Sequence, residues 1–146
     1  MAIGARSTNV EETVRKEVEI WNRHDVGVIG KFYTEDAVVY DPQYEQPLRG
    51  REAIERDARD FLTAFPDLTM RLSNIVSAEG NCGFEVVGSG THRGPLAGPS
   101  GSIPPTNKRI ETKGAIFIRV NAEGLITEEH RYFDLAGMAA QLGIQP

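Results

Sequence analysis

The spacing of hydrophobic and polar positions changes halfway along the chain. In the first half, apolar residues recur with the spacing of amphipathic helices, and charged residues fill the positions between them. A first helix is predicted to begin at its expected N-cap, Thr8 or Asn9, and to end in the segment 22–25. Its apolar stripe is Val10, Val14, Val18 and Trp21. A second helix is predicted between Gly50 and Pro66. Its stripe is Ile54, Ala58, Phe61 or Leu62, and Phe65.

Shorter elements and a run of strands complete the pattern. Val26 to Phe32 is expected to form a small helix interrupted by glycines, and Asp36 to Asp41 a short strand that Pro42 stops. From residue 68 onward, β-branched alternation predicts two hairpins. Their strands are Leu68–Ser77, Phe84–Arg93, Glu111–Val120 and Leu125–Phe133. A last helix is predicted over Leu135–Leu142, before Gly143.

Residues 94–107, between the two hairpins, are rich in glycine, proline and serine, which predicts a surface loop of the kind that borders functional sites.

No repeat or linker divides the chain, so residues 1–146 are predicted to form one domain. Helices followed by antiparallel strands indicate an α+β fold. In it, a strongly curved antiparallel sheet would pack on the N-terminal helices as a cone, with an open mouth where small-molecule sites tend to form.

Composition narrows the classes of function. Hydrophobic residues make up 40% of the chain and charged residues 25%, an ordinary globular balance. A net charge of −5 argues against a nucleic-acid partner. No segment approaches the roughly 18 apolar residues of a membrane helix, and the N-terminus lacks the apolar core of a signal peptide. Cys82 is the only cysteine and the three histidines lack metal-ligand spacing. We therefore expect a cytoplasmic protein with no metal, no membrane contact and no nucleic-acid partner.

Several short motifs occur in an order that resembles a known family. They are Phe32-Tyr33-Thr-Glu-Asp-Ala-Val-Val-Tyr-Asp41-Pro42, Gly50-Arg-Glu-Ala-Ile54, Phe65-Pro66-Asp67-Leu68, Gly90-Thr-His92-Arg-Gly-Pro-Leu-Ala-Gly98, Glu129-His130-Arg-Tyr132-Phe-Asp134 and Gln141-Leu-Gly143. Together they cover nearly the whole chain. Their order and spacing resemble the SnoaL-like polyketide cyclases and the related ester cyclases of the nuclear transport factor 2-like superfamily.

The resemblance implies a cone-shaped fold, often a homodimer, that uses neither a cofactor nor a metal. It also implies ring closure of a polyketide-like carbonyl compound by intramolecular aldol condensation, with one aspartate as acid and base. Asp134 is the position that matches this aspartate. The family usually has a Pro-Thr-Gly-Lys turn, and this chain departs from it with Asn107 in place of the glycine.

The last strand carries the candidate catalytic residues. Alternation places Glu128, His130, Tyr132 and Asp134 on one side of it, but the opposite set is no more apolar, so periodicity leaves the inward face undecided. The resemblance favours the first set facing the pocket. Asp134 would then be a general base whose pKa an apolar pocket raises, although it also suits the N-cap of the last helix. Tyr132 would donate a hydrogen bond to a developing enolate. His130 is the third candidate, too far from Asp134 for a direct dyad.

Five further residues are candidates for contact with the substrate: His92, Asp41, Trp21, Tyr40 and Phe65. His92 ends a strand beside the glycine-rich loop, and Asp41 lies where the rim of the cone is expected. The alternative for each of the five is a structural role, as a satisfied core histidine, a turn aspartate or a core aromatic residue.

The sequence therefore predicts a cofactor-independent cyclase or isomerase that acts on a small, hydrophobic, carbonyl-containing ligand. Two alternatives stay open. One is a non-catalytic protein that binds a small hydrophobic metabolite. The other is an enzyme of the ketosteroid isomerase or dehydratase type, which would need a second neutral acid or a tyrosine near the base, with Tyr132 and Tyr40 as candidates.

Overall fold

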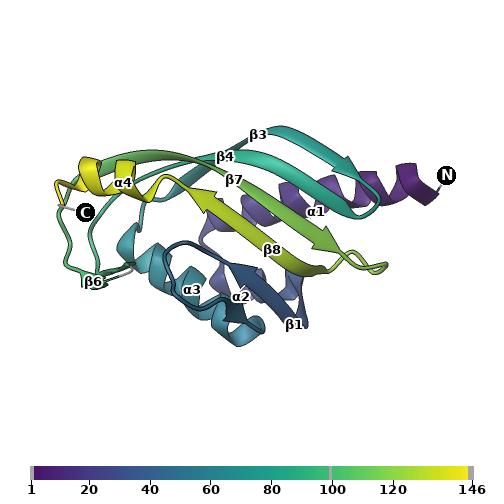
Figure 1. Cartoon of the computed structure of the whole chain (residues 1–146), viewed down its shortest axis with the longest axis horizontal. Helices are drawn as coiled ribbons and strands as arrows, with labels where there is room; N and C mark the ends of the chain where they lie inside the picture. The colour runs from purple at the N-terminus through teal and green to yellow at the C-terminus, as the bar shows by residue number, and fades with distance from the viewer. Residues whose placement is uncertain (1, 99, 145–146) are drawn as a thin grey trace.

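Six strands form one curved sheet that packs on helices (Figure 1). The computed structural model of the chain describes residues 2–98 and 100–144. The strands are β1 (Tyr33–Tyr40), β2 (Leu48–Arg49), β3 (Thr69–Ala78), β4 (Asn81–Thr91), β7 (Arg109–Val120) and β8 (Ile126–Phe133). Their order in the sheet is β2-β1-β8-β7-β4-β3, and only the β1–β8 pairing is parallel. The predicted α+β class, with a curved and mainly antiparallel sheet, is confirmed.

The helices are α1 (Ala2–Arg23), α2 (Val26–Ile29), the 3-10 turn η1 (Gly30–Phe32), α3 (Arg51–Ala64) and α4 (Leu135–Leu142). α1 packs on β3 and β4, α3 packs on β1, and α4 packs on β7. In Figure 1, α4 lies at the opposite end of the molecule from the first turns of α1. α1 begins at Ala2, so the expected cap at Thr8 or Asn9 is wrong: both residues lie inside the helix. No helix among residues 2–98 and 100–144 is long and apolar enough to cross a membrane.

The glycine-rich segment between the two predicted hairpins contains a small hairpin of its own. β5 (Leu96–Gly98) pairs with β6 (Gly101–Ile103), so the predicted loop is partly ordered as strands. Asn107, which replaces the glycine of the expected turn, has a φ of 60°. Asparagine tolerates this left-handed conformation better than most residues, which explains how the turn is kept without glycine.

A β-bulge decides which side of β8 faces the helices. Val120 pairs with Ile126, whereas the preceding residue Arg119 pairs with Glu128, so β8 has one residue more than β7 at this point. An extra residue reverses the alternation of all side chains that follow it. Ile126 is fully buried. Beyond the bulge, the residues on the helix side are odd-numbered: Glu129, Arg131 and Phe133.

Candidate functional site

A cavity lies between the helices and the concave side of the sheet. Its walls are mainly apolar and aromatic, and they include Trp21, Phe61, Phe65, Leu68, Met70, Phe84, Val86, Ile110, Ile116, Phe133, Leu135 and Met138. Charged side chains from three elements meet in one part of the wall: Glu17 of α1, Asp57 of α3, and Glu129 and Arg131 of β8. The space open to the centres of water-sized molecules is about 80 Å³. This volume holds roughly five to eight waters, so a polycyclic ligand would require lining side chains to move.

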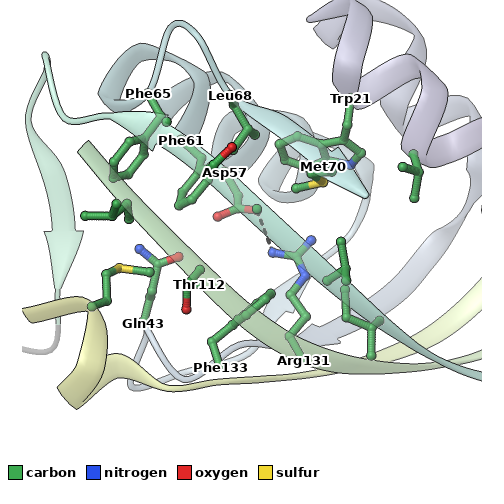
Figure 2. Close-up of a pocket in the computed structure, with 18 of the residues that line it drawn as sticks. Trp21, Gln43, Asp57, Phe61, Phe65, Leu68, Met70, Thr112, Arg131 and Phe133 are labelled. Atoms are coloured by element: carbon green, nitrogen blue, oxygen red, sulfur yellow. Dashed lines mark hydrogen bonds and ion pairs between the residues drawn. The ribbon is translucent and has the colours of Figure 1, made fainter. Parts of the chain in front are cut away.

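Arg131 of β8 is the centre of a buried ionic cluster. Its Nη1 lies 2.9 Å from Asp41 Oδ2 and 2.9 Å from Asp57 Oδ2, and its Nε lies 2.6 Å from Glu129 Oε2. Figure 2 shows the guanidinium directed from β8 toward Asp57 of α3. Burial disfavours the guanidinium charge, but Glu129, Asp57 and Asp41 together raise the pKa of Arg131 well above its ordinary value. Three carboxylates around one cation leave this part of the wall with an excess of negative charge.

The three carboxylates around Arg131 also accept hydrogen bonds from other groups. Tyr44 donates to Asp57 Oδ1 at 2.7 Å, and the backbone N–H of Gln43 donates to Asp41 Oδ1 at 2.8 Å. Tyr33 donates its hydroxyl proton to Glu129 Oε1 at 2.7 Å. The cluster is therefore well satisfied, as buried charges must be.

Glu17 differs from the other acids because no cation among the described residues forms an ion pair with it. It lies on α1, and only 5% of the residue is exposed. Its Oε2 is buried and has no hydrogen-bond partner among the described residues. Burial, followed by repulsion from Glu129, raises the pKa of Glu17 to about 8. At neutral pH this carboxyl group is therefore mostly protonated, in contact with an apolar cavity.

Two of these acids lie on helix faces that otherwise bury apolar residues. Glu17 falls between Val14 and Trp21 on the stripe of α1, and Asp57 falls between Ile54 and Phe61 on the stripe of α3. Both apolar stripes were predicted from the sequence, but neither acid was recognised as part of a site. An acidic residue spaced three or four positions from its apolar neighbours is the signal that would have found them, since such a residue must be buried with the stripe.

The candidate catalytic residues of the last strand lie on the side away from the cavity. The expectation that Glu128, His130, Tyr132 and Asp134 face inward was wrong, because the bulge before Glu128 reverses the alternation. His130 Nε2 lies 2.6 Å from Glu128 Oε2, and the His130 ring stacks on Tyr40 with centroids 4.5 Å apart. Tyr132 is 57% exposed and Tyr40 is 42% exposed.

Asp134 is the N-cap of α4. Its Oδ1 accepts a hydrogen bond of 2.8 Å from the backbone N–H of Gly137. The residue is exposed and does not line the cavity, although its neighbours Phe133 and Leu135 do. The capping interpretation therefore describes its position; a catalytic role for Asp134 stays a prediction.

The candidate substrate-contacting residues divide into two groups. Trp21 and Phe65 line the cavity. Asp41 is buried against Arg131, Tyr40 is on the outer face, and His92 is fully buried behind Phe65, with ring centroids 5.5 Å apart.

His92 holds the end of the glycine-rich segment. Its Nδ1 accepts from the backbone N–H of Thr106 at 3.2 Å, and Asn107 N–H donates to the His92 carbonyl at 2.8 Å. Burial lowers the pKa of His92, so the ring is neutral at physiological pH. Among the residues that the structure describes, no group of three or more His, Cys, Asp or Glu side chains could hold a metal ion.

Comparison with known proteins identifies the family and the fold. A model of the SnoaL-like polyketide cyclase family matches residues 11–142. No curated protein matches the chain. Among solved structures, IdmH of Streptomyces antibioticus, a proposed polyketide cyclase, is 26% identical, with a TM-score of 0.76 over 92% of this chain and 99% of that one.

Two solved structures of lower sequence identity share the fold. A proposed SnoaL-like polyketide cyclase of Jannaschia sp. CCS1 is 17% identical, with a TM-score of 0.83 over 96% of this chain and 95% of that one. AclR of Streptomyces galilaeus, a proposed hydroxylase, is 22% identical, with a TM-score of 0.79 over 96% and 99%. Since these two are proposed to differ in activity, the shared fold does not by itself specify the reaction.

Proposed function

The chain belongs to the SnoaL-like polyketide cyclase family, and on this basis we propose that it closes a ring in a small, polyketide-like carbonyl compound bound in the cavity, with Glu17 as the acid and base. The observation that carries the proposal is the carboxyl group of Glu17, a buried residue that lines the apolar cavity and has one carboxyl oxygen without a hydrogen-bond partner among the described residues.

The proposed step is an intramolecular aldol addition. The ionised Glu17 carboxylate removes a proton from a carbon next to a carbonyl group, and the resulting enolate carbon attacks a second carbonyl carbon of the same molecule. A carbon–carbon bond forms and the carbon–oxygen π bond breaks. The alkoxide then takes the proton back from Glu17, so the carboxylate is regenerated and no other reactant is consumed. A pKa of about 8 suits this role, because it makes Glu17 a stronger base than an ordinary carboxylate.

Asp134 is the alternative candidate for the acid and base, and two isosteric variants distinguish it from Glu17. Turnover is assayed with β-keto esters and other polyketide mimics that carry two carbonyl groups, and products are detected by chromatography and mass spectrometry. Glu17→Gln is expected to lower kcat by about 10²- to 10⁴-fold, the usual contribution of a general base. Asp134→Asn is expected to keep kcat within a few-fold, because asparagine also caps helices and the residue lies off the cavity.

The indole N–H signal of Trp21 in ¹H–¹⁵N spectra reports ligand binding independently of turnover, since Trp21 is the only tryptophan and lines the cavity. Loss of turnover in Asp134→Asn with full activity in Glu17→Gln would return the acid/base role to Asp134. Binding in the cavity without product from any dicarbonyl compound would favour the alternative of a non-catalytic binding protein.

We also propose that the chain is a homodimer joined through the outer face of the sheet. Exposed apolar side chains gather there: Tyr40, Val76, Phe117 and Tyr132. Strand register aligns Tyr40, His130, Phe117, Gly83 and Val76 in one row across five strands. A cytoplasmic location and the lack of a nucleic-acid partner stay predictions.

A further inference from the structure

We propose that Arg131 is the residue that recognises the ligand in the cavity: its second terminal nitrogen, Nη2, donates a hydrogen bond to an uncharged carbonyl oxygen. The inference rests on the proposed function, in which the ligand carries carbonyl groups, and it names the group that would bind one of them. Arg131 would thus determine which ligands the cavity accepts, in addition to holding the ionic cluster together.

The ionic cluster leaves part of Arg131 unused. A guanidinium group has five N–H donors, one on Nε and two on each terminal nitrogen. Nε donates to Glu129, and Nη1 donates to both Asp41 and Asp57. No acceptor among the described residues bonds Nη2, so both N–H groups of this nitrogen remain available. A lysine, with its three donors, would already match the three carboxylates one to one.

Nη2 faces the cavity and is not sealed inside the protein. Arg131 lines the cavity, and Figure 2 shows the terminal nitrogen that does not bind Asp57 on the side of Trp21 and Met70, two residues of the cavity wall. Nη2 is also absent from the described side-chain atoms that are both buried and without a hydrogen-bond partner. Since it has no partner among the described residues, it is therefore accessible, and a small molecule in the cavity can reach it.

The surroundings of Nη2 favour an uncharged oxygen over an anion. Arg131 already pairs with three carboxylates, so the cluster carries more negative than positive charge. A ligand carboxylate at Nη2 would lose its hydration and would be repelled by these three groups. A carbonyl oxygen accepts the same hydrogen bond without that repulsion, and a bond from a charged donor is stronger than one from a neutral donor. The geometry and the charge therefore indicate a ketone-like acceptor at this position.

A matched pair of ligands tests the contact without any reaction. Cyclohexanone and methylenecyclohexane have the same ring and nearly the same shape, but only the first carries an oxygen. Their affinities are measured through the indole N–H signal of Trp21, which lines the cavity. Arg131→Lys keeps a cation with one donor for each carboxylate and removes Nη2. It is expected to lower the ratio of cyclohexanone affinity to methylenecyclohexane affinity by about 10- to 100-fold.

The matched control is Thr112→Val, which replaces the hydroxyl group of another cavity-lining residue by a methyl group. The affinity ratio should stay unchanged in this variant. A third ligand, cyclohexanecarboxylate, tests the preference for an uncharged acceptor: at neutral pH it should bind the wild type more weakly than cyclohexanone does.

A measurement on the wild type does not depend on the folding of any variant. ¹H–¹⁵N spectra of the arginine side chains are recorded with each ligand, and the Arg131 signals are assigned through the backbone of the same residue. Cyclohexanone is expected to shift the Nη signals of Arg131, because its oxygen would accept from Nη2. Methylenecyclohexane, which has no acceptor, should leave these signals nearly in place.

A ketone-specific shift of the Arg131 signals, with a lower affinity ratio in Arg131→Lys and an unchanged ratio in Thr112→Val, would establish the contact. Equal Arg131 shifts with the two ligands, an unchanged ratio in Arg131→Lys, or an equal fall in Thr112→Val would overturn it. Tighter binding of cyclohexanecarboxylate than of cyclohexanone would overturn the preference for an uncharged oxygen. These ligands have at most one carbonyl group and cannot close a ring, so the result is independent of the turnover assay of Glu17→Gln.

Discussion

At the scale of single residues, Glu17 makes stability depend on pH. Its pKa is about 8 in the folded chain, against an ordinary value of 4.5. Between these values the folded state holds a proton that the unfolded state has released, so the free energy of unfolding falls as pH rises. The stabilisation is complete below the unfolded value and is lost as pH passes through the folded one.

We therefore predict that Glu17→Gln changes this dependence. The wild type should lose about 1 kcal/mol for each pH unit between pH 5.5 and 8 from this group alone. The variant has the same shape and cannot ionise, so its stability should fall less over this range. Urea unfolding of both proteins at the two pH values measures the difference, and parallel curves would show that Glu17 titrates near its ordinary value.

Arg131 offers a second prediction at the same scale. Arg131→Met leaves Asp41, Asp57 and Glu129 buried without their cation, and we expect a loss of about 3–5 kcal/mol in the free energy of unfolding. The matched control is Arg23→Met. The pair Arg23–Glu19 has the same 2.6 Å separation as Arg131–Glu129, but its side chains are 66% and 57% exposed. This control should cost less than about 1 kcal/mol, as surface ion pairs do. Equal losses in the two variants would contradict the account of the cluster.

Residue-level prediction from sequence was strongest where a side chain is apolar. Trp21 and Phe65 were named as candidate contacts and do line the cavity. The polar part of the site was not found, because Arg131 gains its importance only when Asp41 and Asp57, far apart in the chain, are brought to it by the fold. Glu17 and Asp57 were detectable, since each interrupts an apolar stripe that had been described.

At the scale of elements, local patterns predicted most of the fold. The last helix has the predicted bounds, and β7 ends at the predicted residue. The prediction of elements failed where hydrogen-bonded pairing between strands, and not the local preference of the sequence, determines the structure. The two-residue strand β2 has too little sequence for a pattern, and the bulge in β8 arises from its register with β7.

The cap of α4 can be tested at this scale. Asp134→Ala removes the acceptor for the Gly137 N–H and should cost about 1 kcal/mol in the free energy of unfolding. Asp134→Ser should restore most of the loss, because serine is also a favoured cap. Chemical denaturation measures both variants. Equal stability of Asp134→Ala and the wild type would mean that the capping bond contributes nothing to the fold.

At the scale of the whole molecule, the two sides of the sheet have different tasks. The concave side and the helices enclose the cavity, while the outer side exposes a row of apolar and aromatic residues. Gly83 allows this row to be close-packed, because the ring of Phe117 lies where a side chain at residue 83 would project. Exposed apolar patches of this kind commonly mark interfaces.

We predict that Phe117→Asp disrupts the proposed homodimer. A charge at the centre of the row would be desolvated on association, so analytical ultracentrifugation should show a shift from dimer to monomer. Lys16→Asp also introduces an aspartate, on the exposed side of α1, and should leave the assembly unchanged. A wild-type chain that sediments as a monomer at micromolar concentration would contradict the proposal.

The bulge at Thr127 also bears on how such proteins diverge. One additional residue determines which set of β8 side chains faces the helices. Deletion of Thr127 would remove the bulge and restore regular alternation, with Glu129, Arg131 and Phe133 still on the helix side. If Thr127 were kept but took an ordinary place in the strand, Glu128, His130 and Tyr132 would turn to the cavity and Arg131 would turn to solvent. A lineage could therefore lose the bulge by deletion of one codon and keep its polar wall, whereas a register that absorbs the extra residue would exchange the whole wall without a single substitution.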